Sequence, residues 1–231
     1  MRAPISVVIP TLNAAPELAA SIHAMFEGLD DGLIRDLIIS DGGSGDDIGA
    51  LADALGATLI TGPAGRGGQL ARGAAAARGE WLLFLHTDTR LAKGWSHACL
   101  KHLADRPDKA GYFRLAFRSD ARAAKLVATW ANLRSAIFGL PYGDQGLLIS
   151  RAVYDRAGGY PDLPLMEDVA LARRLRGNLV ALAVTAETSA DRYIRQGWLN
   201  RGGRNLWTLA RYFAGVSPAR LARDYRQKQP R

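Results

Sequence analysis

Polar and acidic side chains follow three short apolar runs of the chain, at the points where predicted strands end. The residues at these points are Pro10, Thr11, Asn13, Asp41, His86, Thr87 and Asp88. A carboxylate such as Asp41 or Asp88 can accept a hydrogen bond from a ribose hydroxyl or a base N–H, and it can hold a hard divalent cation. Asp is also common in turns because it bonds to its own backbone, so a local role competes for either residue alone. Their occurrence at corresponding strand ends favours a binding site.

The segment Gly62–Gly68 is rich in glycine and carries one basic residue, Arg66. A flexible turn and a phosphate-binding loop are both compatible with this composition. The segment lacks the Lys of the P-loop and the acidic partner of the dinucleotide fingerprint, so it is weak evidence for either motif. Arg66 can still pair with a diphosphate through its N–H donors.

Further acidic residues occur in the second half of the chain. Glu167 and Asp168 stand where a predicted helix begins, and Asp144 precedes Gln145 in a glycine-rich loop. Carboxylates at a helix start interact favourably with the helix dipole, so a capping role competes with a catalytic one. His86 is a candidate metal ligand, and a structural histidine at a strand end is the alternative.

Hydrophobic periodicity predicts the elements that position these residues. Strands are expected over 5–9, 33–40, 57–61, 81–85, 111–118, 146–150 and 179–185. Helices are expected over 16–27, 46–55, 69–78, 121–138, 165–176, 206–216 and 218–226. Strands that alternate with helices are typical of β-α-β units, so we expect an α/β fold with a mostly parallel central sheet flanked by helices. Ligands of such sheets bind beyond the carboxyl ends of the strands, so the polar turns should lie together.

The charge is concentrated at the end of the chain. Of 30 basic and 22 acidic residues, ten basic and one acidic fall in 192–231, which leaves 20 and 21 in 1–191. We therefore expect one α/β domain over 1–191 and a basic helical extension over 192–231, packed on the domain or peripheral to it. No nucleic-acid motif accompanies the basic segment, so no nucleic-acid partner is expected. An anionic membrane surface or a phosphate-bearing substrate suits it equally.

The composition bounds the class of protein. With 48% hydrophobic and 23% charged residues, the chain is unlike disordered, collagenous or disulfide-rich proteins. A single cysteine, Cys99, cannot form an internal disulfide, and the first residues do not form a secretory signal. We expect a cytoplasmic protein, with peripheral association at the inner membrane face as an option.

That option rests on the predicted helix 206–216. Leu206, Leu209, Phe213 and Val216 are spaced to form one helical face, with arginines nearby. A basic amphipathic helix of this kind can lie on a membrane surface. Packing of this face on the core is the interpretation that we favour.

Five motifs in order resemble the family 2 glycosyltransferases of the GT-A fold. They are SVVIPTLN, ISDGGS, LLFLHTDT, GDQG and MEDVALARRL. The chain is most similar to a small bacterial subgroup known as arsenosugar-biosynthesis or radical-SAM-associated glycosyltransferases. The resemblance implies a Rossmann-like sheet, a nucleotide-diphosphate sugar as donor, a divalent cation (Mg²⁺ or Mn²⁺) and an acceptor hydroxyl on a small or lipid-linked molecule. It also implies an inverting transfer with a carboxylate as base.

The resemblance also implies roles for individual residues. The donor nucleotide would be bound by Pro10, Thr11, Asn13, Asp41, Arg66, Thr87 and Asp88. Asp88 would be the main metal ligand, with His86 at the first position of the family's D-x-D motif. Asp168 would be the catalytic base, with Glu167 as the second candidate, and Asp144 and Gln145 would lie on the acceptor side. Ala14 and Ala71 stand where many relatives carry Glu and Asn, which leaves the choice of nucleotide open.

Two other functions remain as alternatives. A sugar-phosphate nucleotidyltransferase usually has a Gly-rich first turn with a Lys, which the turn 10–13 does not match. A non-catalytic protein that binds nucleotide sugars or polyanions is the other alternative. The presence of Asp88, Glu167 and Asp168 argues against it.

Overall fold

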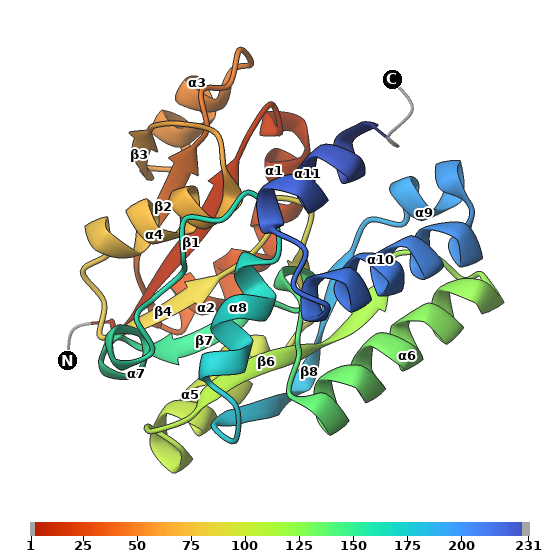
Figure 1. Ribbon diagram of the computed structural model, residues 1–231. Coiled ribbons are helices and arrows are strands. Elements are labelled where there is room, and N and C mark those ends of the chain that lie inside the picture. Colours follow the sequence, from red (N-terminus) through yellow and green to blue (C-terminus); the bar gives the residue numbers. More distant parts are fainter. Residues whose placement is uncertain (1–2, 228–231) are drawn as a thin grey trace.

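The computed structural model describes residues 3–227, in which eight strands form one sheet in the order β3-β2-β1-β4-β7-β6-β8-β5 (Figure 1). The strands are β1 Ile5–Thr11, β2 Ile34–Asp41, β3 Thr58–Thr61, β4 Trp81–Phe84, β5 Arg90–Leu91, β6 Ala110–Phe117, β7 Leu147–Ser150 and β8 Leu179–Thr188. Four of the seven strand pairings are parallel, and β7 and β5 supply the antiparallel ones. The expected α/β fold with a mostly parallel sheet is confirmed.

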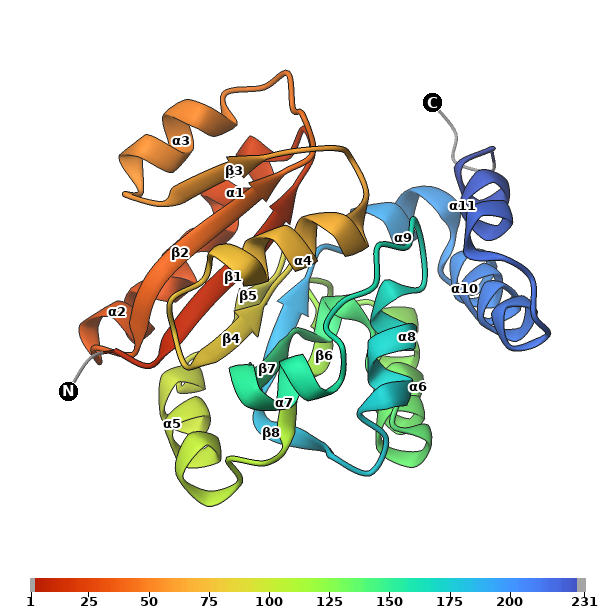
Figure 2. The same cartoon turned by 60° about the vertical axis from the view of Figure 1, so that its left-hand side comes forward.

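Helices cover both faces of this sheet. They are α1 Ala15–Ser21, α2 Phe26–Asp30, α3 Ile48–Ala54, α4 Arg66–Ala76, α5 Trp95–Asp105, α6 Arg122–Phe138, α7 Arg151–Arg156, α8 Glu167–Arg174, α9 Asp191–Gln196, α10 Trp198–Phe213 and α11 Pro218–Gln227, with 3₁₀ turns η1 Ile22–Met25 and η2 Gly143–Gln145. One apolar cluster joins the sheet to α1, α3 and α5, and a second joins it to α4, α7 and α8. Figure 2 shows α4, α7 and α8 on the same side of the sheet.

The first strand differs from its prediction because it continues through Pro10. Pro10 is aligned with Ser40 of β2, whereas the pairing of β1 with β4 ends at Val8 and Phe84. β4 has separated from β1 at this point. The missing N–H of Pro10 therefore removes no hydrogen bond between β1 and β4. The strand therefore carries Thr11 to the edge of the sheet.

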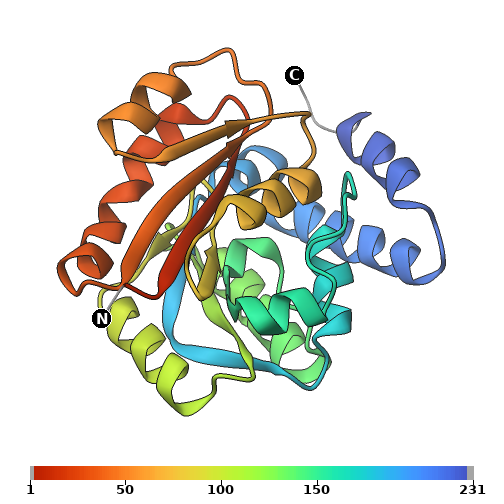
Figure 3. The same ribbon diagram turned by 90° about the vertical axis from the view of Figure 1, so that its left-hand side faces the viewer.

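The helical extension packs on the domain. Leu209 of α10 and Leu221 of α11 are buried in a cluster with Leu140 and Val169. Trp198 and Tyr193 pack their rings against Phe117 of β6, with centroids 5.1 and 4.8 Å away. In Figure 3, α10 and α11 (blue) lie away from α3 and β3 (orange). The boundary at 191 stays a prediction, since α9 begins at this residue.

The sequence prediction missed several short elements and misplaced one helix. β5, α7 and α9 were not predicted, and α10 begins at Trp198, well before the predicted start at 206. Gly202 and Gly203 lower the helix propensity of that segment, and packing against the domain overrides it. Across 3–227, the helices are too short or too polar to cross a bilayer.

Candidate active site

The carboxyl ends of β1, β2 and β3 lie at one edge of the sheet. Because the three strands are parallel, their register aligns Thr11 with Asp41 and Asp41 with Thr61. β4 is also parallel to β1 and leads into the turn 86–89. The polar turns therefore lie together at this edge, as the strand order predicts.

Asp41 is buried at this edge among donors of its own chain. Its Oδ2 accepts hydrogen bonds from the backbone N–H groups of Gly43 and Ser44, both at 2.8 Å. Its Oδ1 accepts from the hydroxyls of Thr11 at 3.0 Å and Ser44 at 2.5 Å. Burial acts to raise the pKa of Asp41, but these hydrogen bonds outweigh it and lower the pKa. All four acceptor positions are taken, so Asp41 shapes the turn 42–45 that borders the site.

Asn13 joins the turns that follow β1 and β2. Its backbone has a φ of 48°, in the left-handed region that Asn tolerates better than most residues. Its side-chain Oδ1 accepts from the N–H of Gly45 at 2.8 Å, and its own N–H donates to the hydroxyl of Ser44 at 2.8 Å. Thr11 and Asn13 therefore hold the edge of the site in shape, and Pro10 is half-buried in β1 beside them.

Gln69 of α4 is a positioning residue that sequence reasoning missed. Its Nε2 donates to the carbonyl of Thr11 at 2.6 Å and to that of Ser40 at 2.9 Å. Its Oε1 accepts from the N–H of Gly65 at 3.2 Å. One buried amide thus ties the ends of β1 and β2 to the start of α4. Nothing in the local sequence marks this residue, because its partners come from distant segments.

The turn His86–Thr89 is held by residues of other elements. The carbonyl of Thr87 accepts from the hydroxyl of Ser21. Arg118, after β6, donates to the carbonyl of Asp88 at 2.7 Å. These bonds fix the backbone of the turn and leave the Asp88 side chain half-buried, without a hydrogen bond to another part of the chain that the structure describes. Arg118 was not predicted, because its role depends on a contact across the sheet.

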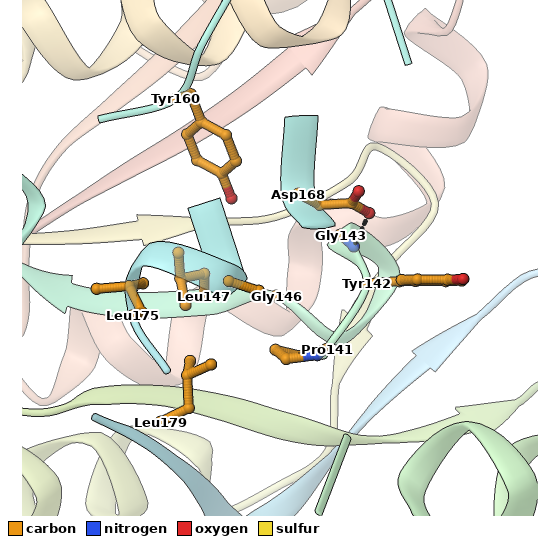
Figure 4. A pocket seen from close by; sticks show the side chains of 10 residues that line it. Pro141, Tyr142, Gly143, Gly146, Leu147, Tyr160, Asp168, Leu175 and Leu179 are labelled. Carbon is orange, nitrogen blue, oxygen red and sulfur yellow. Dashed lines mark hydrogen bonds between the residues drawn. The ribbon is translucent and has the colours of Figure 1, made fainter. Parts of the chain in front are cut away.

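Asp168 projects from the start of α8 toward the loop before β7, as Figure 4 shows. Its Oδ2 accepts from the N–H of Gly143 at 2.9 Å, and its Oδ1 accepts from the N–H of Val169 at 2.7 Å. Met166, two residues before Asp168, has a left-handed backbone conformation with a φ of 68°. Such strain in a non-glycine residue is often found at functional sites. Asp168 is also one of the residues that line a cavity of about 10 Å³, room for about one water.

Glu167 is buried beside Asp168 and pairs with Arg66 at the start of α4. Its Oε1 lies 3.5 Å from Nη1 of Arg66, whose side chain is 42% exposed. Burial raises the pKa of Glu167 to about 7, the charge of Asp168 adds to this effect, and Arg66 opposes it. Arg66 is thus anchored on one side and open to solvent on the other, where an anionic ligand can reach it.

Asp144 is influenced by charges both from the turn after β4 and from the start of α8. Burial raises its pKa to about 6. The charges of Asp168 and Asp88 also raise this pKa, whereas Arg134 and Arg66 lower it. Its Oδ1 is buried without a hydrogen-bond partner. Since Asp88 follows β4 and Asp168 begins α8, Asp144 lies where the carboxylates of both halves influence one group.

Gln145 does not face this space. It is fully buried, and its Oε1 accepts from the hydroxyl of Ser135 at 2.6 Å and from the N–H of Tyr142 at 3.3 Å. Its Nε2 donates to the carbonyl of Phe113 at 3.2 Å. The structure therefore gives Gln145 a positioning role, in which it fixes the loop that carries Gly143 and Asp144. Its assignment to the acceptor side is not supported by a contact with the site.

We expect Glu167→Gln to change the pH dependence of stability. The folded chain keeps a proton on Glu167 up to about pH 7, whereas an unfolded chain releases it near the usual pKa of 4.5. The contribution of Glu167 to the free energy of unfolding should therefore fall as the pH rises through this window. Gln removes this contribution, so the variant should gain stability relative to wild type above pH 7.

Urea unfolding below and above this window measures the effect. The exposed Glu80 supplies the control variant Glu80→Gln. A stability difference between Glu167→Gln and wild type that is the same on both sides of the window would contradict the raised pKa.

The surroundings of Asp88 and His86 indicate whether these two residues could bind a metal ion. Within residues 3–227, no three His, Cys, Asp or Glu side chains form a cluster that could hold a metal ion. Nε2 of His86 is buried without a hydrogen-bond partner. Burial, followed by the charges of Arg66 and Arg192, keeps the pKa of His86 well below its usual value, so the ring is neutral. Mg²⁺ is often bound by one or two carboxylates together with substrate phosphates and waters, and the residues fit a cation shared with a bound diphosphate.

Comparisons with solved structures support the fold. A mannosyltransferase from Pyrobaculum calidifontis, in complex with GDP-Man and Mn²⁺, is 17% identical with a TM-score of 0.66, over 95% of this chain and 67% of that one. Glucosyl-3-phosphoglycerate synthase from Mycobacterium tuberculosis, with Mn²⁺, UDP and glucosyl-3-phosphoglycerate, is 23% identical with a TM-score of 0.53, over 80% and 70%. S. aureus TarS 1-349, with UDP-GlcNAc, is 12% identical with a TM-score of 0.61. The chain spans 58% of that TarS structure, and the match covers 80% of this chain.

These similarities show the expected GT-A fold. No curated protein sequence matches the chain. The model of the family named "Glycosyl transferase family 2" matches residues 6–149, which include β1, β4, β7 and the turns at the candidate site. Because this match extends over more than half of the chain and agrees with its fold, the chain belongs to glycosyl transferase family 2.

Proposed function

We propose that this glycosyltransferase moves a sugar from a nucleotide-diphosphate donor to an acceptor hydroxyl, with the help of a divalent cation and with inversion at the anomeric carbon. The observation that carries the proposal is the position of Gly143, whose N–H donates to Oδ2 of Asp168 at 2.9 Å and on which an added Cβ would lie 2.5 Å from Nε2 of His86. It brings the strand-end half of the site, suited to a donor, against a second half with a carboxylate base. The donors and Mn²⁺ in the structures of similar fold support the same class of substrate.

The donor would lie along the edge formed by β1, β2 and β4. The turn shaped by Asp41, together with Thr11 and Asn13, would border the nucleoside. Arg66 presents its exposed side near the diphosphate position and is held in place by Glu167. This arrangement offers charge-assisted hydrogen bonds to an anionic group without a separate phosphate loop.

Asp88, with His86, would hold the cation. When bound, the cation neutralises negative charge that grows on the departing diphosphate. The carbonyl of Asp88 is fixed by Arg118, so the carboxylate starts from a defined backbone position. His86 is neutral because burial disfavours its charged form, which leaves one ring nitrogen able to ligate.

Asp168 would take the proton from the acceptor hydroxyl. Its carboxylate accepts hydrogen bonds from Gly143 and Val169, which orient it without supplying a competing cation. As the hydroxyl oxygen forms its bond to the anomeric carbon, the proton passes to Asp168 and the bond to the diphosphate breaks. One base opposite the leaving group gives a direct displacement and an inverted product.

The narrower assignments rest on sequence resemblance alone. The subgroup known as arsenosugar-biosynthesis or radical-SAM-associated glycosyltransferases, and a hexose as the transferred sugar, are part of this proposal. The acceptor is defined only as a hydroxyl-bearing molecule.

We expect one nucleotide-diphosphate sugar to raise the melting temperature of the wild-type protein only when Mn²⁺ or Mg²⁺ is present. At a concentration about a hundred times Kd, binding stabilises the folded state by about 2.7 kcal/mol, or roughly 5–10 °C for a chain of this size. The cation-dependent part of the shift should be lost in Asp88→Ala. A thermal-shift panel of nucleotide diphosphates and their sugars, with and without the cation, measures this.

The matched control is Asp108→Ala, which removes an exposed carboxylate from the turn after α5. This variant should behave as wild type. A shift that survives unchanged in Asp88→Ala would place the cation elsewhere, and no shift with any nucleotide sugar would overturn the proposed donor class.

A further inference from the structure

The exposed face of α10 is apolar along its whole length. Leu199 is 86% exposed and Trp207 is 63% exposed, with Leu206 and Phe213 on the same face. The remaining exposed positions of α10 are Asn200, Gly203 and Ala210, so none of them is charged. The arginines of α10 turn elsewhere: Arg201 is buried, and Arg211 pairs with Asp224 at 2.7 Å. A solvent-facing helix normally places its charged residues on the exposed side, and α10 has the opposite arrangement.

α6 repeats this arrangement. Leu126, Trp130, Leu133 and Ile137 are 46–70% exposed and are spaced i, i+4, i+7 and i+11, which aligns them along one side of the helix. The opposite side of α6 packs on β6 through Ala124, Ala128 and Ala131. Phe138 extends the exposed stripe at the end of the helix.

The two helices lie side by side. α10 packs on α6, and Figure 1 shows both running along the same flank of the molecule. Together they expose nine large apolar side chains: Leu126, Trp130, Leu133, Ile137, Phe138, Leu199, Leu206, Trp207 and Phe213. We call this set the α6/α10 face. An exposed apolar surface of this kind marks an interaction site, because an isolated monomer rarely leaves so many large apolar residues in water.

The charges around the α6/α10 face are mostly basic. Exposed cations occur at the start of α6, on α9 and on α8: Arg122, Lys125, Arg192, Arg195 and Arg173. Arg173 lies over the ring of Phe213, 5.4 Å from its centroid. Two exposed acidic residues, Asp120 and Asp191, adjoin this set in sequence, and no further Asp or Glu occurs in 121–143 or in 192–223. The surface that covers this face is therefore expected to be apolar beneath and negatively charged at its border.

We propose that the α6/α10 face docks on an anionic lipid surface. Leucines and tryptophans would enter the boundary between headgroups and acyl chains, and the surrounding cations would contact the anionic headgroups. A second copy of the chain fits less well, because two identical faces would bring like charges together at their borders. This proposal is independent of the sugar-transfer chemistry.

The α6/α10 face shares only Leu206 and Phe213 with the sequence-based hypothesis. That hypothesis placed Leu206, Leu209, Phe213 and Val216 on one membrane-facing side. Leu209 is buried in the cluster with Val169, and Val216 packs on the same cluster. The favoured interpretation, packing on the core, therefore holds for Leu209 and Val216, whereas Leu206 and Phe213 are exposed. The exposed side of α10 adds Leu199 and Trp207 to Leu206 and Phe213, and α6 contributes the other members of the α6/α10 face.

The test is flotation of the full chain with vesicles of phosphatidylcholine alone and of phosphatidylcholine mixed with phosphatidylglycerol. Wild type should bind the anionic vesicles at least about tenfold more tightly than the neutral ones, and added salt should weaken this binding. The double variant Leu133→Ser/Trp207→Ser removes one apolar anchor from each helix. It should bind at least about tenfold more weakly than wild type.

A matched control replaces an exposed leucine outside this face. Leu100 of α5 is 43% exposed, so Leu100→Ser should leave vesicle binding unchanged. Circular dichroism of both variants establishes that they fold. The proposal is overturned if folded wild type does not bind anionic vesicles, or if the double variant binds as well as Leu100→Ser. It is also overturned if the wild-type protein is a dimer in solution that the double variant dissociates, which would make a second copy the occupant.

Discussion

Asp168→Asn is expected to lower kcat by about 10²–10⁴-fold while leaving the affinity for the donor unchanged. The range is the usual contribution of a positioned general base. Asn matches the shape of Asp and can still accept the N–H of Gly143, which lies 2.9 Å from Oδ2 of Asp168. The amide cannot take a proton from the acceptor, so the loss falls on the chemical step and not on the placement of the loop.

The surroundings of Asp168 explain why this residue and not its neighbour should be the base. Glu167 is buried, its pKa is raised to about 7, and its carboxylate faces Arg66. Asp168 is half-buried, accepts two backbone N–H groups and borders the one-water cavity. Glu167 therefore suits the anchoring of Arg66, and Asp168 suits contact with an incoming hydroxyl.

Release of nucleoside diphosphate, with the donor identified by thermal shift and an acceptor that supports wild-type turnover, measures kcat. Asp155→Asn, at an exposed position on α7, is the control and should retain wild-type turnover. Proton NMR of the first-formed product should show the inverted anomer. A loss of less than about tenfold in Asp168→Asn would exclude it as the base, and a retained anomer would exclude the direct displacement.

The edge of the sheet that carries the site could be predicted from the sequence. The apolar runs before Pro10, Asp41 and His86 are short, strongly apolar and separated by helical segments, so both their type and their parallel order follow from local pattern. The parallel register then places the residues after them at one edge. This part of the site depends on chain direction and strand order, which the sequence encodes locally.

The residues that hold this edge in shape could not be predicted. Gln69 bonds to the carbonyls of Thr11 and Ser40, and Arg118 bonds to the carbonyl of Asp88. Each contact joins segments far apart in sequence and ends on a backbone carbonyl. Every residue has such a carbonyl, so the identity of the accepting residue gives no signal in the sequence. Gln145 was singled out by a motif, yet its full burial places it in the support of the loop. A motif identifies the segment, and only the packing decides which of its residues faces the ligand.

Gly67 shows the same limit in the glycine-rich segment, which suggested a phosphate loop or a flexible turn. The residue lies inside α4, which begins at Arg66. A Cβ on Gly67 would meet the carbonyl oxygen of Pro161 at 2.1 Å and the nitrogen of Leu163 at 2.8 Å. Glycine is therefore required so that the backbone of 161–163, which leads into α8, can lie against α4.

Gly67→Ala should consequently destabilise the protein by about 1–3 kcal/mol, the usual cost of overpacking, and lower the melting temperature by roughly 2–12 °C. The backbone of 161–163 has to move to admit the methyl group, and this shift would reach Glu167 and its pair with Arg66.

Gly49 occupies the same second position of its helix, α3, and an added Cβ there would meet nothing within 4 Å. Gly49→Ala should therefore stabilise the protein by up to about 1 kcal/mol through helix propensity alone. Thermal and urea unfolding of the two variants compare the same chemical change with and without the close approach. If Gly67→Ala is as stable as Gly49→Ala, the segment 161–163 does not pack on α4 in solution, and the placement of α8 against the donor half of the site would have to be revised.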